Sequence, residues 1–166
     1  MGELEKVSLL LDKLCIEAFI LMEQHIETKI NLERSMCDGE TFLAKSRYIM
    51  GQNCVSALQL PTEDSSEMDA SAVLHSHKDD TAFGQRLLEL EIKKKSSDPD
   101  CRIQDPLRWF GVLVPQDLHK AQVKYKQALS WCVQSVNVQT KLHETCTKIK
   151  QLKNYKIKLM MEEKQT

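Results

Sequence analysis

Aromatic side chains, glycine and proline are all scarce in this chain of 166 residues. Aromatic residues make up 5% of the sequence, which has only five glycines and four prolines. Most of the apolar content therefore comes from leucine, isoleucine, valine, methionine and alanine. That composition favours elongated helical packing over a thick globular core.

Sequence patterns that mark enzymes and cofactor sites are also missing. The chain has no G-x-S-x-G, P-loop, G-x-G-x-x-G or H-E-x-x-H motif. Its six cysteines never form a C-x-x-C pair, and we interpret them as reduced thiols of a cytosolic protein. Of these, Cys132 and Cys146 are expected to lie in the core of a helix pair. We predict that the protein is not an enzyme and has no cofactor.

One cluster resembles a metal site, and it consists of His75, His77, Asp79 and Asp80. A metal ion would need more ligands that are fixed in space. These residues lie in the stretch that we expect to be least ordered, so we predict no metal site.

Long hydrophobic runs are absent as well. The longest uncharged run, Gln127 to Thr140, is too short and too rich in Gln, Ser and Asn to cross a bilayer, which needs about 20 apolar residues. Charged residues interrupt the apolar pattern at the N-terminus, which argues against a secretory signal. We predict no membrane span, so that any contact with a membrane goes through a partner.

What the sequence does contain is a helical repeat in its N-terminal part. Apolar or small residues recur there at alternating spacings of three and four, which is the pattern of a heptad seam. The seam comprises Leu4, Val7, Leu11, Leu14, Ala18, Leu21, His25, Thr28 and Leu32. A second stripe, displaced by about 140° around the helix axis, comprises Leu9, Ile16, Phe19, Ile26 and Ile30. A helix with two such stripes needs neighbours on two sides.

The pattern predicts an N-terminal helix over residues 3–50 and a C-terminal helix over residues 115–163, separated by a variable middle segment over 52–104. Gly39 marks either a break or a tolerated weak point in the first helix, and Gly51 its end. Pro115 suits the first turn of the second helix. We expect the two helices to pair as an elongated antiparallel coiled-coil hairpin, which makes the fold mainly α and residues 1–166 a single coiled-coil domain.

The middle segment shows weaker patterns. Val55–Leu60 and Arg86–Ile92 each alternate briefly between apolar and polar residues, which suggests a small antiparallel β pair. Pro61–Ala82 and Lys93–Asp105 are rich in polar residues, and we expect both to be flexible, with the helical hairpin carrying a partly disordered insert.

Charge is distributed unevenly along the chain. The segment from Glu3 to Arg34 has seven acidic and four basic residues, whereas the segment from Gln116 onward has four acidic residues and ten lysines. The lysine-rich end has the charge to bind nucleic acid or anionic lipid. We favour the reading in which it neutralises the acidic helix and solvates its own outer face, with no nucleic acid as a partner.

The densest apolar string of the chain is DPLRWFGVLVP, from Asp105 to Pro115. A polar linker would not contain so many apolar side chains, because burying each one stabilises a folded or bound state by roughly 1.5–3 kcal/mol. These side chains must dock on the protein's own helices or on a partner. The string therefore indicates binding rather than reaction chemistry.

Two strings, LAKSRYIMG (Leu43 to Gly51) and QDPLRWFGVLVPQDLHKAQ (Gln104 to Gln122), together resemble the coiled-coil domain-containing protein 115 family. That family consists of assembly factors of the vacuolar proton-pumping ATPase. The resemblance implies a non-enzymatic chaperone that acts at the cytosolic face of the endoplasmic reticulum, in the ER–Golgi intermediate compartment, and also at endosomes and lysosomes. The partners that it implies are an integral-membrane assembly factor and subunits of the pump, and the outcome is organelle acidification.

The two strings also predict a binding site for a partner protein. We expect Trp109, Phe110, Leu113 and Pro115 to form a partner-docking element, with Arg47, Tyr48 and Gly51 beside it. Equally, the two strings can pack on each other and simply fasten the hairpin. The alternative function is a self-associating coiled-coil scaffold or vesicle tether.

Overall fold

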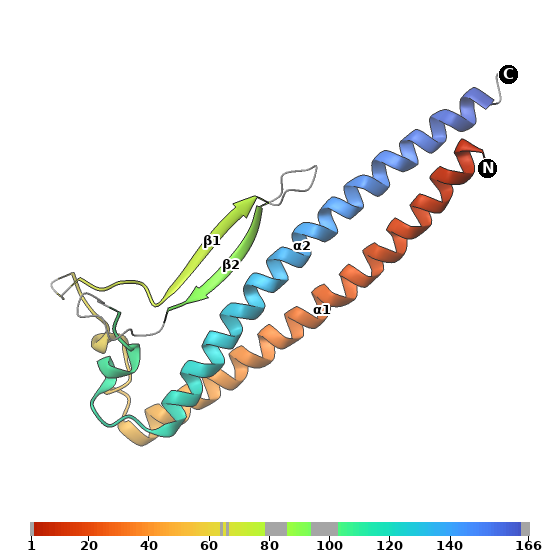
Figure 1. Cartoon of the computed structure of the whole chain (residues 1–166). Helices are drawn as coiled ribbons and strands as arrows, with labels where there is room; N and C mark the ends of the chain where they lie inside the picture. The colour runs from red at the N-terminus through yellow and green to blue at the C-terminus, as the bar shows by residue number, and fades with distance from the viewer. Residues whose placement is uncertain (1, 64, 66, 79–85, 94–102, 164–166) are drawn as a thin grey trace. The chain divides into compact units, whose positions relative to one another are not determined.

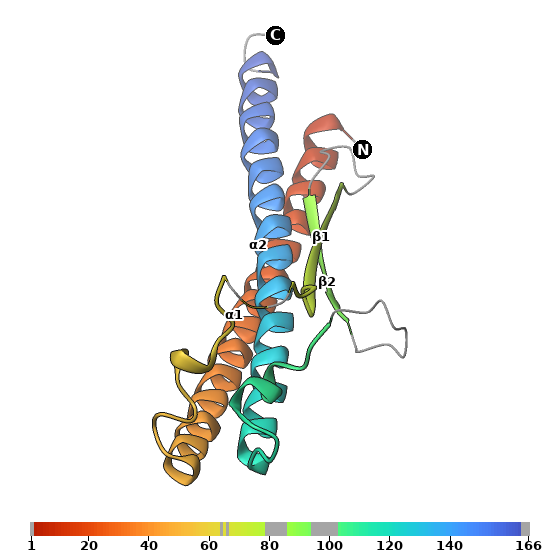
Figure 2. The same ribbon diagram turned by 90° about the vertical axis from the view of Figure 1, so that its left-hand side faces the viewer.

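Two long helices make up most of the structure. The computed structural model describes residues 2–63, 65, 67–78, 86–93 and 103–163. Helix α1 (Glu3–Met50) and helix α2 (Gln116–Glu163) pack antiparallel, and a two-stranded antiparallel sheet, β1 (Ala72–Lys78) and β2 (Arg86–Ile92), lies between them in the sequence (Figure 1). Figure 2 shows the two helices side by side from a second direction. The predicted fold, a mainly α antiparallel helix pair with a small β pair, is confirmed.

The chain divides into two compact units. One contains residues Met1–Lys29 and Gln134–Thr166, and the other contains Ile30–Val133. Each unit therefore holds one stretch of α1 and one stretch of α2. That residues 1–166 form a single domain stays a prediction.

The heptad seam predicted for α1 is the buried side of the helix. All nine predicted seam residues are buried or half-buried, with Val7, Leu11, Ala18 and Thr28 buried most deeply. The five residues of the second stripe are all exposed. The sequence predicts that α1 packs against neighbours on two sides. Among the described residues, only the seam side of α1 is covered.

Small residues, not large apolar ones, fill the buried positions in the middle of α2. Leu129, Cys132 and Val136 are exposed, and Ala128 and Ser135 are the buried residues there. Cys146 is exposed as well, so the prediction of two core thiols is wrong. The distance between paired helices depends on the side chains at their contact, and small residues allow the backbones to approach. Alanine and serine therefore take the inward positions, and the larger side chains turn outward.

Gly39 does not break α1. The helix continues through it to Met50, and Gly39 is buried against α2. A Cβ atom at this position would lie 3.2 Å from both Cε1 and Cζ of Tyr125. Beside it, Lys124 Nζ lies 2.8 Å from Asp38 Oδ2. Gly39 is a tolerated weak point, because the missing side chain leaves room for the tyrosine ring.

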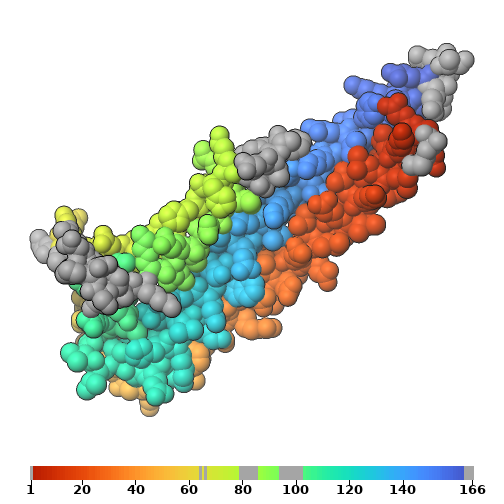
Figure 3. All heavy atoms as spheres, viewed as in Figure 1, coloured from red at the N-terminus to blue at the C-terminus, as the bar shows by residue number. Residues whose placement is uncertain are grey.

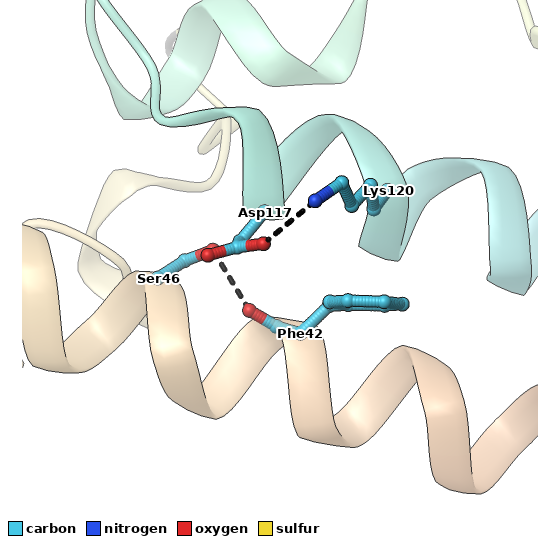
Figure 4. A network of polar contacts seen from close by, with 4 residues as sticks. All are labelled: Phe42, Ser46, Asp117 and Lys120. Atoms are coloured by element: carbon cyan, nitrogen blue, oxygen red, sulfur yellow. Dashed lines mark hydrogen bonds and ion pairs between the residues drawn. The ribbon is translucent and has the colours of Figure 1, made fainter.

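Hydroxyl side chains occupy further buried positions of the helix pair. Ser46 is fully buried, and its Oγ donates to the Phe42 carbonyl oxygen of the same helix at 2.8 Å. Figure 4 shows Phe42 and Ser46 on α1 facing Asp117 and Lys120 on α2. Lys120 Nζ lies 3.4 Å from Asp117 Oδ1 and 5.6 Å from the centre of the Phe42 ring. Because the hydroxyl is satisfied within α1, Ser46 can be buried at the contact without a partner on α2.

The β pair uses one predicted strand and one that the sequence pattern did not reveal. β2 coincides with the predicted Arg86–Ile92, but Val55–Leu60 is not a strand. Val55 is buried in the core, and the 3₁₀ turn η1 (Ala57–Gln59) follows it, with Ser56 Oγ accepting from the Leu58 amide at 3.4 Å. The partner strand β1 lies inside the predicted loop Pro61–Ala82. Its side chains are mostly exposed on both faces, so the sequence lacks the apolar alternation from which strand β1 could have been predicted.

Candidate functional site

The two strings that carry the family resemblance meet in one apolar core. Its buried residues are Val55, Leu107 and Leu118. Leu43 and Met50 of the first string, together with Phe110 and Val114 of the second, pack against it. Residues of both strings therefore pack against the same core, which is the arrangement expected if the strings pack on each other to fasten the hairpin.

Asp105 and the residues after it shape the second string into a short 3₁₀ helix, η2 (Pro106–Phe110). Asp105 Oδ1 accepts from the Leu107 amide at 3.1 Å and from Gln122 Nε2, on α2, at 2.7 Å. Pro106 fixes the backbone at the start of the turn, and Gly111 ends it at φ 130°, a conformation that favours glycine. The string is thus held to α2 by a side-chain bond as well as by Leu107.

The carboxyl group of Asp105 is kept ionised by these contacts. Partial burial works to raise the pKa of Asp105, but the hydrogen bonds from Gln122 and the Leu107 amide, with the positive charges of Lys126 and His119, outweigh it. The pKa of Asp105 therefore lies below its ordinary value.

Gly51 ends α1 as predicted, at φ 89°. Its amide donates to the Arg47 carbonyl oxygen at 2.9 Å, and the Arg47 side chain donates through Nε to the Val55 carbonyl oxygen at 3.1 Å. These bonds turn the chain back so that Val55 enters the core. Arg47, Tyr48 and Gly51, which the sequence nominated, line one open groove of ≈ 790 Å³ together with Ala44, Gln52, Val55, Ser56 and Ala57.

Between the core residues of each string lies a pair of exposed apolar side chains. Tyr48 is 92% exposed and Ile49 61%, and they lie between Leu43 and Met50 in the sequence. Val112 is 101% exposed and Leu113 93%, and they lie between Phe110 and Val114. We call these four residues (Tyr48, Ile49, Val112 and Leu113) the rim. These four are the large apolar side chains of the two strings that remain in water while their neighbours are buried.

The remaining nominated residues of the second string take intermediate positions. Phe110 is half-buried against the core, and Pro115 is half-buried directly before α2, where its carbonyl oxygen accepts from the Leu118 amide at 3.0 Å. Trp109 is half-buried, and its buried indole Nε1 finds no hydrogen-bond acceptor among the described residues. Of the predicted docking residues with large apolar side chains, Leu113 and Tyr48 are therefore the most accessible. Ile49 and Val112 were not nominated, although their place beside Tyr48 and Leu113 in apolar strings was the signal that pointed to them.

No metal-binding group of side chains accompanies this site in the part of the chain that the structure describes. Within residues 2–78, 86–93 and 103–163, as far as they are described, no group of three or more His, Cys, Asp or Glu side chains is placed to hold a metal ion. His75 Nε2 instead lies 2.9 Å from Glu91 Oε2, across the β pair, while Asp79 and Asp80 lie outside the described residues. None of the described helices contains an apolar stretch long enough to cross a membrane. What the site offers is an apolar contact surface.

Comparison with known proteins assigns the chain to a set of relatives. It is 25% identical over 150 residues to the vacuolar ATPase assembly protein VMA22 of Mus musculus, an alignment that covers 80% of this chain and 83% of the mouse protein. The chain is a homologue of VMA22. It is 27% identical to VMA22 of Homo sapiens over 153 residues, which cover 80% of this chain and 83% of the human protein. VMA22 of Danio rerio is 25% identical over 158 residues, which cover 72% of this chain and 76% of the fish protein.

The VMA22 proteins are the coiled-coil domain-containing protein 115 family, so the resemblance read from the two strings is confirmed. No protein-family profile matches the chain. The alignments to VMA22 proteins extend over more than two thirds of this chain, well beyond the roughly thirty residues of the two strings.

Proposed function

We propose that this chain is a non-enzymatic assembly factor of the vacuolar proton-pumping ATPase. The observation that carries the proposal is homology to VMA22 proteins, whose name states that role, over most of the length of both chains. The exposed apolar rim supports it, because a factor that holds other polypeptides during assembly needs accessible apolar contacts.

The proposal extends to where and with whom the chain acts. An integral-membrane assembly factor is its partner at the cytosolic face of the endoplasmic reticulum and in the ER–Golgi intermediate compartment, and pump subunits bind to the pair. The chain also acts at endosomes and lysosomes, and its loss impairs organelle acidification. The resemblance carried by Leu43 to Gly51 and Gln104 to Gln122 supports this part.

Within the chain, the rim is the partner-docking surface, with Trp109 at its margin. Trp109 is only half-buried, so the exposed part of its ring is open to a partner. Arg47 and Gly51 shape the adjacent groove, whereas Phe110 and Pro115 hold the string in place.

The experiment is a rescue of cells that lack the endogenous protein. The unaltered chain should restore the amount of assembled pump on native gels and the acidity of the pump's compartments. The double variant Val112→Ser/Leu113→Ser should restore both poorly and should recover at least about fivefold less of the membrane partner and pump subunits, since interface anchors contribute more than about 1 kcal/mol each. Leu74→Ser, which changes an exposed leucine of β1, is the matched control and should rescue fully.

Two outcomes contradict the proposal at different levels. If the unaltered chain restores neither assembly nor acidity, the assembly function is wrong. If the double variant rescues as well as the unaltered chain, the function stands and the rim is not the docking surface.

A further inference from the structure

A second apolar surface lies on α1, well away in sequence from the rim. It is formed by Leu9, Ile16, Phe19 and Ile26, which are between 47% and 70% exposed. These residues and the acidic Asp12 and Glu23 recur at spacings of three and four, so they line one side of the helix as a second heptad seam. We call this side the outer seam. In Figure 3 the flank of the N-terminal half of α1 (red to orange) that faces away from α2 is uncovered on the side in view.

The charges of the outer seam all have one sign. Asp12 and Glu23 occupy heptad positions within it, and Glu5 occupies a further one towards the N-terminus. None of these three carboxylates forms an ion pair with a described residue. No lysine or arginine occupies a seam position between Glu5 and Ile26, and Lys13 and Glu27 flank the seam at equivalent heptad positions. The surface therefore combines unpartnered apolar side chains with unpaired negative charge.

We propose that the outer seam binds an amphipathic helix of another protein, whose apolar stripe is flanked by lysine or arginine. Such a helix would cover the apolar residues and neutralise the carboxylates, as residues flanking the seam do in heteromeric coiled coils. From Leu9 to Ile26 the seam extends over about 26 Å at 1.5 Å per residue, which matches a partner helix of about five turns. This inference does not depend on the proposed role in pump assembly.

The same features argue against two other occupants. A second copy that paired through its own outer seam would bring Asp12 and Glu23 of both chains into one interface whose seam positions hold no cation, and like charges there oppose association. The exposed apolar residues of α2 in the same unit, among them Tyr155, Ile157 and Met161, do not continue as a stripe that a copy could offer instead. An anionic membrane surface would be repelled by the three carboxylates at the seam positions.

The test uses the full-length chain and two labelled peptides of 21 residues. Both peptides carry leucine and isoleucine at the seam positions of three heptads, one with lysine and the other with glutamate at the flanking positions. Fluorescence anisotropy should show that the lysine peptide binds at least tenfold more tightly than the glutamate peptide, and that added salt weakens the binding. Absence of binding, or equal binding of the two peptides, overturns the proposal.

Variants of α1 locate the binding surface. Phe19→Gln should weaken binding of the lysine peptide at least tenfold, whereas Leu10→Gln, an exposed leucine on another side of α1, should not. Glu23→Lys should weaken the lysine peptide and strengthen the glutamate peptide, and its matched control Glu17→Lys should change neither appreciably. Because all four residues are exposed, circular dichroism should show an unchanged helix content. If Phe19→Gln nevertheless unfolds the chain, the charge-reversal pair decides.

Two further measurements separate the competing occupants. A dimer that light scattering detects with the unaltered chain and not with Phe19→Gln would assign the seam to a second copy and overturn the proposal. Binding to phosphatidylserine vesicles that Phe19→Gln abolishes would assign it to a membrane, with the same consequence.

Discussion

Tyr125 of α2 lies over Gly39 of α1, with ring carbons Cε1 and Cζ 3.2 Å from the place where a Cβ atom of residue 39 would be. Glycine in the interior of a helix costs about 1 kcal/mol relative to alanine. The close approach of the tyrosine ring explains why α1 carries this cost at a buried position.

Enlarging residue 39 tests this relationship. Gly39→Leu should lower the free energy of unfolding by about 1–3 kcal/mol, because the new side chain must displace Tyr125. Chemical denaturation followed by circular dichroism measures it. In the background of Tyr125→Ala the same substitution should cost less, and a loss that is equal in both backgrounds would show that the ring is not what excludes a side chain at this position.

Substitutions in the second string should affect the free energy of unfolding only where the side chain is buried. Leu107→Ala should lower the free energy of unfolding by about 2–5 kcal/mol, because Leu107 is buried in the core with Val55 and Leu118. Leu113→Ala should change it by no more than about 0.5 kcal/mol, because that side chain is almost wholly in water. Denaturation curves of the two variants give both values. Equal losses would mean that Leu113 is packed in solution.

Because of Asp105, the free energy of unfolding should decrease at acidic pH. Its pKa is lower in the folded chain than the unfolded value of about 3.9, so the contribution of its carboxylate is fully present above that value and is lost as the pH falls through the folded pKa. Asp105→Ala should cost about 1 kcal/mol at neutral pH, since it removes a cap of η2 and the bond to Gln122. Asp105→Asn, which keeps an acceptor for the cap, should cost less and should flatten the dependence of unfolding on pH between about 2 and 5.

The hydroxyl group of Tyr155 should lose its proton at a higher pH than an ordinary tyrosine does. Its hydroxyl donates to Glu3 Oε1 at 2.7 Å, and this hydrogen bond, followed by the negative charge of Glu3, raises the pKa of Tyr155 above its ordinary value of 10.0. The bond stabilises the fold below the unfolded pKa of about 10 and is lost as the pH rises through the folded pKa. In a chain whose tyrosine rings are labelled with ¹³C at Cζ, NMR should show that Glu3→Gln moves the titration of Tyr155 to lower pH. A titration that does not move would show that this bond is absent in solution.

Buried hydroxyls of the helix pair should tolerate removal but not enlargement. Ser46→Ala should change the free energy of unfolding by no more than about 0.5 kcal/mol, because the Ser46 hydroxyl bonds only to its own helix among the described residues. Ser46→Phe should lower it by about 1–3 kcal/mol, because Ser46 is fully buried on the side of α1 that faces Asp117 (Figure 4) and a ring would overpack this contact. Thermal melts of both variants would show the contrast, and similar melting temperatures would argue that the helices can separate at this point.

Local sequence patterns determined much of the fold. Alternating spacings of three and four fixed which side of α1 is buried, because residues at those spacings share one face of a helix. Gly51 and Pro115 marked the inner ends of the two helices, because the backbone preferences of glycine and proline act within a few residues. Strand β2 could be predicted from its period-two pattern of apolar residues. Strand β1 could not, because its side chains are mostly exposed and its pairing with β2 depends on backbone hydrogen bonds, which produce no apolar pattern in the sequence.

Only the tertiary structure decided which apolar residues face inward. In α2, Ala128 and Ser135 are buried while Leu129 and Val136 are exposed, since closeness of the helix backbones outweighs the hydrophobicity of single residues. In the second string, Leu107 and Phe110 enter the core while Val112 and Leu113 remain in water, because Gly111 turns the chain between them. The sequence alone determined that two helices with apolar strings at their inner ends exist. Which of those side chains remain free for another protein depends on long-range packing, which no local pattern encodes.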